Sequence, residues 1–380
     1  MNQQVITNAR VILEDEIILG TVVVEFGQIR KIDQGVSQLP NASDWEGDYL
    51  MPGMIELHTD NMEKYFAPRP GVSWPGVSAM IAHDTQMAAS GITTVFDAVS
   101  VGYDVYKSKR SEMLSDIIDA LQYIKNNQIS RAEHFLHLRC ELSCDVTAQE
   151  FDRYARHPLL RLVSLMDHSP GQRQFARIEK YIEYYQTKYG FSDEAMKESI
   201  EQHQLASQNW SRKHREYIAG NCNERDIPLA SHDDASIDHV TEALRHQVSI
   251  AEFPTTMEAA EHSHHSCLKV LMGAPNLIRG HSHSGNVAAR ELAEQGYLDI
   301  LSSDYYPASL LQSAFLLHQL DIGYDLPRAI RCVTGNPASA AGLDDRGVIA
   351  EGKKADLLRV AMHDDLALLK QTWQHGVRVN

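Results

Sequence analysis

Short apolar runs alternate with amphipathic stretches over most of this chain. Between residues 51 and 344 the runs are rich in Val, Ile and Leu, and the stretches between them repeat apolar residues at intervals of three and four. Strands that alternate with helices in this way are typical of βα units around a parallel sheet. The runs that we predict as strands are residues 54–58, 93–98, 133–141, 161–167, 227–232, 249–253, 268–274 and 299–304.

Eight such units predict an α/β fold with a (β/α)8 TIM-like barrel, in which functional residues lie at the C-terminal ends of the strands. The two ends of the chain have a different texture. Residues 1–50 and 345–380 contain short Val- and Ile-rich strands separated by turns. We therefore expect these two segments to form one small β-sandwich domain beside a barrel made of residues 51–344.

Some polar residues fit a structural role best. Ser192 precedes a segment with acidic residues in its first turn, so it is predicted as the N-cap of a long helix. His83 and Asp84 lie on a helical stretch and are interpreted as packing and polar-bonding residues. His134 and His137 are interpreted as polar contacts in the barrel interior.

Composition narrows the class of partner. Among the 380 residues 43% are hydrophobic, and the net charge of −16 argues against binding nucleic acid or anionic membranes through a basic surface. The apolar runs are too short to span a membrane, and the first residues do not resemble a signal peptide. Five cysteines without a C-x-x-C pair indicate reduced thiols, which favours a cytoplasmic protein.

Most of the predicted strands end in side chains that bind metals or transfer protons. These are His58 and Asp60, Glu141, Asp167 and His168, His232 with Asp233 and Asp234, Glu252, and Asp304. Like charges gathered on one rim are costly without a counter-charge, so one or two divalent cations are expected there. Residues i and i+2 of a strand point the same way, so His58 and Asp60 can share an ion. Imidazole and carboxylate ligands suit zinc, which we favour, as well as manganese or iron.

Longer motifs resemble a known superfamily. The N-terminal β segment, the H-x-D pair after the first barrel strand, the aspartate after the eighth and the closing "GVIAEGKKADLLRV" resemble the amidohydrolase superfamily. "IELHTDNMEKYFAPRP", "SLMDHSPGQRQF" and "DILSSDYYPASLL" are similar to a branch that acts in phosphonate catabolism, in the bacterial carbon–phosphorus lyase pathway. This resemblance implies a small-molecule substrate, a ribose 1-methylphosphonate with a 5-triphosphate, which water cleaves to the 5-phosphate and pyrophosphate.

The resemblance also implies roles for the strand-end residues. His58, Asp60, His232 and Asp304 match metal ligands of the superfamily, and Asp304 is also its expected catalytic base. The fourth strand lacks the lysine that often bridges two ions, so Glu141 is expected as the bridge. The sixth strand has "AEFPTT" where the superfamily has a histidine. His168, or a histidine of "HSHSGN", is therefore expected to complete the set.

A triphosphate also needs cationic ligands. The expected substrate-binding residues lie in or near loops of the same rim: Lys64, Arg69, Arg139, Arg173, Arg279, His281 and His283. The loop "HSPGQRQF" suits phosphate capture because it combines Gly and Pro with an arginine.

Other interpretations stay open at this point. A deaminase or deacetylase on the same fold would cleave a C–N bond, and a non-catalytic barrel would bind its ligand without turnover. A homodimer is a further expectation, because barrels of this kind often pair.

Overall fold

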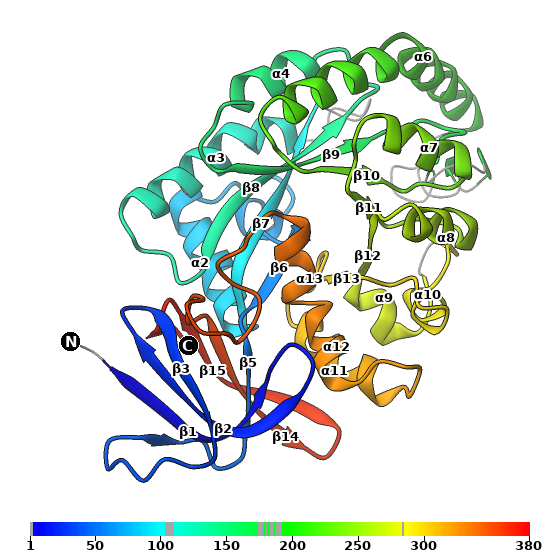
Figure 1. Cartoon of the computed structure of the whole chain (residues 1–380). Coiled ribbons are helices and arrows are strands. Elements are labelled where there is room, and N and C mark those ends of the chain that lie inside the picture. The colour runs from blue at the N-terminus through cyan, green and yellow to red at the C-terminus, as the bar shows by residue number, and fades with distance from the viewer. Residues whose placement is uncertain are drawn as a thin grey trace.

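Eight parallel strands form a barrel in the computed structural model, which describes residues 3–102, 110–173, 178–179, 181–182, 186, 192–282 and 285–380 (Figure 1). The strands are neighbours in chain order: β6 (Met54–Thr59), β7 (Ile92–Val101), β8 (Glu133–Glu141), β9 (Leu160–Met166), β10 (Leu229–His232), β11 (Ile250–Glu252), β12 (Lys269–Gly273) and β13 (Ile300–Ser302). Each coincides with a predicted strand to within a few residues, so the barrel prediction is confirmed.

Helices follow most of these strands and cover the outside of the barrel (Figure 1). They are α1 (Glu63–Phe66), α2 (Gly76–Ala89), α3 (Arg110–Asn126), α4 (Thr147–Tyr154), α6 (Asp193–Asn223), α7 (Ile237–Arg245), α8 (Met257–His265), α9 (Ala274–Arg279), α10 (Ala289–Glu294), α11 (Ser309–Gln319), α12 (Leu326–Arg331) and α13 (Gly335–Ala340). Ser192 caps α6 as predicted, since its side chain accepts a hydrogen bond from the amide of Ala195. Within the described residues, no helix is both long and apolar enough to cross a membrane.

The interior of the barrel is filled by apolar side chains. Every barrel strand contributes to this cluster, with Ile55, Leu57, Phe96, Phe135, Leu162, Ala230, Ile250, Leu271 and Ile300. A barrel packed in this way is a core and not a pore. The strand-end residues singled out from the sequence lie above this layer, at the C-terminal ends of the strands.

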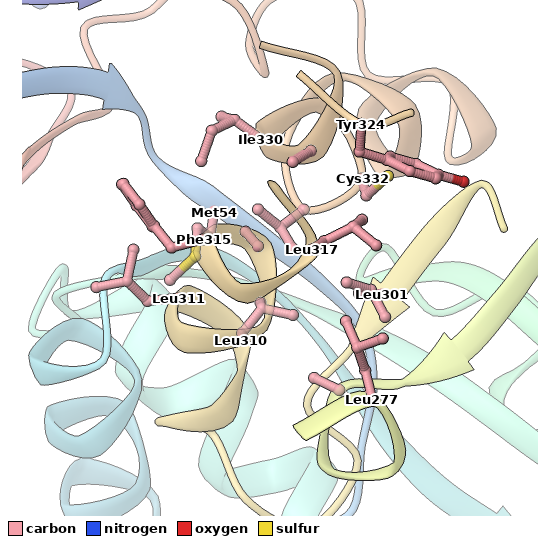
Figure 2. Packing of buried hydrophobic residues seen from close by; sticks show 14 of the residues in the cluster. Met54, Leu277, Leu301, Leu310, Leu311, Phe315, Leu317, Tyr324, Ile330 and Cys332 are labelled. Atoms are coloured by element: carbon pink, nitrogen blue, oxygen red, sulfur yellow. The ribbon is translucent and has the colours of Figure 1, made fainter. Parts of the chain in front are cut away.

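A second apolar cluster lies outside the barrel, against its first and last strands. Figure 2 shows Met54 of β6 and Leu301 of β13 packed with Leu310, Phe315 and other residues of α11 and α12. All four of these side chains are at most 4% exposed. The cluster joins α11 to both β6 and β13.

The two ends of the chain pair with each other, as predicted. Their mixed sheet has the order β16-β15-β14-β5-β1-β2-β3, with β4 beside β1. Its strands are β1 (Gln4–Ile12), β2 (Ile17–Glu25), β3 (Gln28–Gln34), β4 (Ser43–Asp44), β5 (Tyr49–Pro52), β14 (Leu357–His363), β15 (Leu366–Gln374) and β16 (Val377–Arg378). The antiparallel pair of β5 with β14 joins the two ends, and Figure 1 shows the N-terminal (blue) and C-terminal (red) strands together below the barrel. The exact domain boundaries remain a prediction.

Gly53 connects this terminal sheet directly to the barrel, between β5 and β6. A Cβ atom at this position would lie 2.2 Å from Oγ1 of Thr93 on the neighbouring strand β7. Only glycine permits so close an approach. The first barrel strand, which carries His58, therefore starts from a position set by both sheets.

Candidate metal centre

Glu252, at the end of β11, holds two histidines at the mouth of the barrel. Its carboxylate lies 3.1 Å from Nδ1 of His58 and 3.2 Å from Nδ1 of His232, and it accepts a hydrogen bond of 2.6 Å from Ser164. A ring that donates through Nδ1 keeps its lone pair on Nε2, where a metal ion can bind. Burial alone would raise the pKa of Glu252, but the imidazoles of His58 and His137 hold it well below its usual range.

A second group shares His232 with the first. Nδ1 of His168 lies 2.6 Å from Oε2 of Glu141, and its Nε2 lies 3.7 Å from Oδ2 of Asp233. The same carboxylate oxygen of Asp233 is 3.5 Å from Nε2 of His232. Burial lowers the pKa of His168, but Glu141 and Asp233 outweigh it and raise this pKa to about 10. Metal binding to His168 would therefore release a proton.

Two further carboxylates lie at the same mouth, Asp60 after β6 and Asp304 after β13. Burial raises the pKa of Asp304 to about 6, and the charge of Asp60 adds to this effect. Arg139 is the nearby cation, with Nη1 at 3.8 Å from Oδ2 of Asp60. Thr59 Oγ1 donates to the backbone oxygen of Asp304 at 2.8 Å, which joins the ends of the two strands.

These donors fit a divalent metal ion. Two sets of three donor atoms lie within 4.8 Å of one another, His58 with His232 and Glu252, and His232 with His168 and Asp233. Neutral imidazole and carboxylate groups are the ligands of catalytic zinc and related ions. Because His232 belongs to both sets, the arrangement suits one ion or two adjacent ions.

The structure thus brings together most of the ligands expected from the sequence, although their role as ligands remains a prediction. Two central residues were not among the expected ligands. Glu252 stands where the superfamily has a histidine, and it orients the histidines of two other strands. Asp233 directly follows His232. The signal for both was the same strand-end position that singled out His58 and Glu141.

Arg139 differs from the other expected substrate-binding residues. It lies on β8, is only 9% exposed, and its Nε atom has no hydrogen-bond partner among the described residues. Arg173 is also buried, but its guanidinium contacts Asp234 very closely and lies 3.2 Å from Glu242. Arg215 also contacts Glu242, at 2.7 Å, so Arg173 belongs to a network of two arginines and two carboxylates.

The remaining expected cations are at the surface. Lys64, Arg69, Arg279 and His281 are exposed, and Arg279 Nη2 lies 3.5 Å from Nε2 of His281. Partial burial lowers the pKa of Lys64, against the opposing effect of Asp60. His283 lies outside the described residues. The contribution of these side chains to substrate binding remains a prediction.

A separate buried cluster lies between α2 and the strands β7 and β8. Asp97 lies 2.7 Å from both Nε2 of His83 and Nδ1 of His134, and Asp84 lies 3.1 Å from Nε2 of His134. With a carboxylate at each nitrogen His134 is an imidazolium, and these carboxylates raise its pKa to about 10 against the effect of burial. Arg131 Nη1 lies 3.4 Å from Oδ2 of Asp84, so His134 and Arg131 together offset the two carboxylates, and this ion network needs no metal ion.

This cluster tests three expectations from the sequence. The polar-bonding interpretation of His83 and Asp84 is confirmed. The interior position expected for His134 was wrong, because Phe135 points into the barrel and adjacent residues of a strand point to opposite faces. His137 does lie in the interior, where it contacts the backbone oxygen of Leu57 and Ser164.

Comparison with known proteins places this geometry in context. The amidohydrolase family model matches residues 49–377. Alpha-D-ribose 1-methylphosphonate 5-triphosphate diphosphatase of Escherichia coli (strain K12) is 51% identical over 376 residues, which cover 99% of this chain and 100% of that protein. Solved structures include molinate hydrolase, with a TM-score of 0.67, 13% identity and coverage of 100% of this chain and 95% of that one. N-acetylglucosamine-6-phosphate deacetylase from Pasteurella multocida has a TM-score of 0.64, 13% identity and coverage of 99% of each chain. At such identities the two structures show a shared fold only.

Proposed function

Because this chain belongs to the amidohydrolase family, we propose that its barrel mouth is a metal-dependent active site for a phosphoanhydride. The proposed substrate is alpha-D-ribose 1-methylphosphonate 5-triphosphate, cleaved to the 5-phosphate and pyrophosphate in phosphonate catabolism. The observation that carries this proposal is the 51% identity to the E. coli diphosphatase over 99% of this chain. A match of this length includes every strand end that contributes to the candidate metal centre.

The residues proposed to hold the metal are His58, Asp60, Glu141, His168, His232 and Asp304. Glu252 supports the set, because it fixes the rings of His58 and His232 through their Nδ1 atoms. When bound, a divalent ion such as zinc would polarise a phosphoryl oxygen and lower the pKa of water. Imidazole and carboxylate donors without a thiolate leave zinc, manganese and iron as candidates.

Asp304 is proposed as the general base that takes the proton from the attacking water. Its pKa, raised to about 6 by burial and by Asp60, leaves it ionised at neutral pH and more basic than an ordinary aspartate. A base with a pKa close to the working pH transfers protons most effectively. Its position at the end of β13 places it among the charges of Asp60, His58 and Asp233.

Arg139 is proposed to bind the phosphate groups at the reacting end of the triphosphate. Its buried guanidinium has a free Nε donor and lies beside Asp60, close to the proposed metal ligands. An arginine can donate two parallel hydrogen bonds to phosphate oxygens and balance the charge of the leaving pyrophosphate. The exposed cations Lys64, Arg69, Arg279 and His281, with His283, would hold the outer phosphates.

A substrate panel tests this function. Metal-loaded protein is given the ribose phosphonate triphosphate, ATP or an N-acyl sugar, and the release of pyrophosphate or of the cleaved acyl group is measured. Pyrophosphate release with a strong preference for the ribose phosphonate supports the proposal. Equal cleavage of ATP contradicts the proposed substrate, and cleavage of the N-acyl sugar alone would identify a C–N hydrolase instead.

A further inference from the structure

The barrel has one weak junction, between its first strand β6 and its last strand β13. The other neighbouring strands of the barrel are joined by ladders of backbone pairs. Among the described residues, the backbone pairing between β6 and β13 is the single bridge from Thr59 to Asp304. This junction carries proposed metal ligands on both sides, so a small shift there would change the distances between ligands.

The carboxylate of Glu56 spans this junction. Glu56 lies on β6, is 0% exposed, and accepts hydrogen bonds of 2.5 Å from the hydroxyl of Ser302 and 2.6 Å from the amide of Ser303. One side chain of the first strand therefore holds two successive residues at the end of the last strand. Burying a carboxylate without hydrogen-bond partners costs roughly several kcal/mol of folding free energy. These hydrogen bonds are therefore needed to keep Glu56 in the interior.

The same two side chains hold the backbone of His58. The amide of His58 donates to Glu56 at 2.7 Å, and the hydroxyl of Ser302 lies 2.6 Å from the carbonyl oxygen of His58. Across the junction, the amide of Asp304 lies 3.3 Å from the Ser302 hydroxyl. Glu56 and Ser302 thus contact the backbone of a proposed ligand on each strand.

We propose that Glu56 and Ser302 form a clasp that positions His58 and Asp304 relative to each other. Neither residue is expected to touch substrate or metal, and the role is one of positioning. Metal sites tolerate errors of only about 0.2 Å in ligand distances, so a junction held by one backbone bridge needs such reinforcement. This positioning role depends on the metal centre of the proposed function.

Ser263 supplies a matched control. It lies on α8, is 0% exposed like Ser302, and its hydroxyl has no hydrogen-bond partner within the described part of the chain. Ser302→Ala and Ser263→Ala therefore remove the same atom from fully buried positions, and only the first breaks the clasp. Glu56→Gln keeps the side-chain volume but replaces one carboxylate oxygen by an NH2 group. This group cannot accept a hydrogen bond from the groups that donate to Glu56. Ser302→Thr keeps the hydroxyl.

The experiment measures zinc affinity of the full-length protein by competition with a chelator, together with kcat and KM for pyrophosphate release. We expect Ser302→Ala and Glu56→Gln to weaken zinc binding about 10- to 100-fold, the usual effect of losing a residue that orients ligands. The turnover number should fall with little change in KM. Ser263→Ala should stay within about twofold of the wild type, and Ser302→Thr should retain most of the affinity.

Unfolding temperatures of the metal-free proteins separate positioning from simple stabilisation. A Ser302→Ala protein that melts earlier but binds zinc like the wild type would overturn the clasp. If Ser302→Ala does not fold, Glu56→Gln decides by the same criterion. A wild-type protein that binds no divalent ion would instead refute the metal centre, so the two failures can be told apart.

Discussion

Asp304→Asn isolates the proton transfer proposed for the last barrel strand. Asp304 has a φ of 55°, a left-handed conformation that asparagine adopts about as readily as aspartate, so the backbone should not change. The amide has nearly the same shape but cannot accept the proton of water. A general base contributes about 10²- to 10⁴-fold, so we expect kcat to fall about 100-fold or more. This corresponds to an increase of about 2.7 kcal/mol in the activation free energy.

The assay is pyrophosphate release at saturating triphosphate, with metal content measured on the same samples. The amide oxygen of asparagine remains a metal ligand, so bound metal should stay near the wild-type level. Asp364→Asn is the matched control, because Asp364 is exposed, lies between β14 and β15, and has a similar φ of 52°. A turnover for Asp304→Asn close to that of the control would show that Asp304 is not the base.

Three further changes test other parts of the structure. Arg139→Met removes the buried charge. We expect kcat/KM for the triphosphate, measured in steady-state assays, to fall about 10- to 100-fold, because hydrogen bonds to a charged group are lost. An unchanged kcat/KM would exclude phosphate binding by Arg139. The folded pKa of His134 is about 10, above its unfolded value, so its stabilisation is complete below about pH 6.5 and is lost as the pH rises towards 10. The difference in unfolding free energy between the wild type and His134→Gln, measured with urea from pH 6 to 10, should shrink across that window, and a constant difference would contradict the ion network. Phe315→Ala should lower the free energy of unfolding, measured in urea titrations, by about 3–5 kcal/mol, because Phe315 is buried in the cluster of Figure 2. A loss below about 1 kcal/mol would show that the cluster repacks around the missing ring.

The barrel and the terminal sheet could be predicted because their signals are local. Buried parallel strands appear as apolar runs, and all eight runs became barrel strands. The resemblance to phosphonate-pathway amidohydrolases is confirmed by the full-length relative and the family match. Polar strand ends indicated the mouth of the barrel, because parallel strands bring their C-terminal ends to one face.

The partners of individual side chains could not be predicted, because they depend on contacts between distant residues. Glu252 contacts His58, 194 residues earlier in the chain, and nothing near either residue indicates this pair. Arg173 is predicted as a phosphate ligand from its Gly- and Pro-rich loop, and nothing in that loop indicates its contacts with Asp234 and Glu242. The outward position of His134 was predictable in principle, since Phe135 is the apolar residue that fills the barrel.

The central claim is that ions held by these strand ends are required for phosphoanhydride hydrolysis. The most direct test is to titrate zinc into chelated wild-type protein and to measure bound zinc and pyrophosphate release from the ribose phosphonate triphosphate together. We predict that activity is absent after chelation and rises in proportion to bound zinc, up to one or two ions per chain. Full activity in protein that contains no metal would contradict the account.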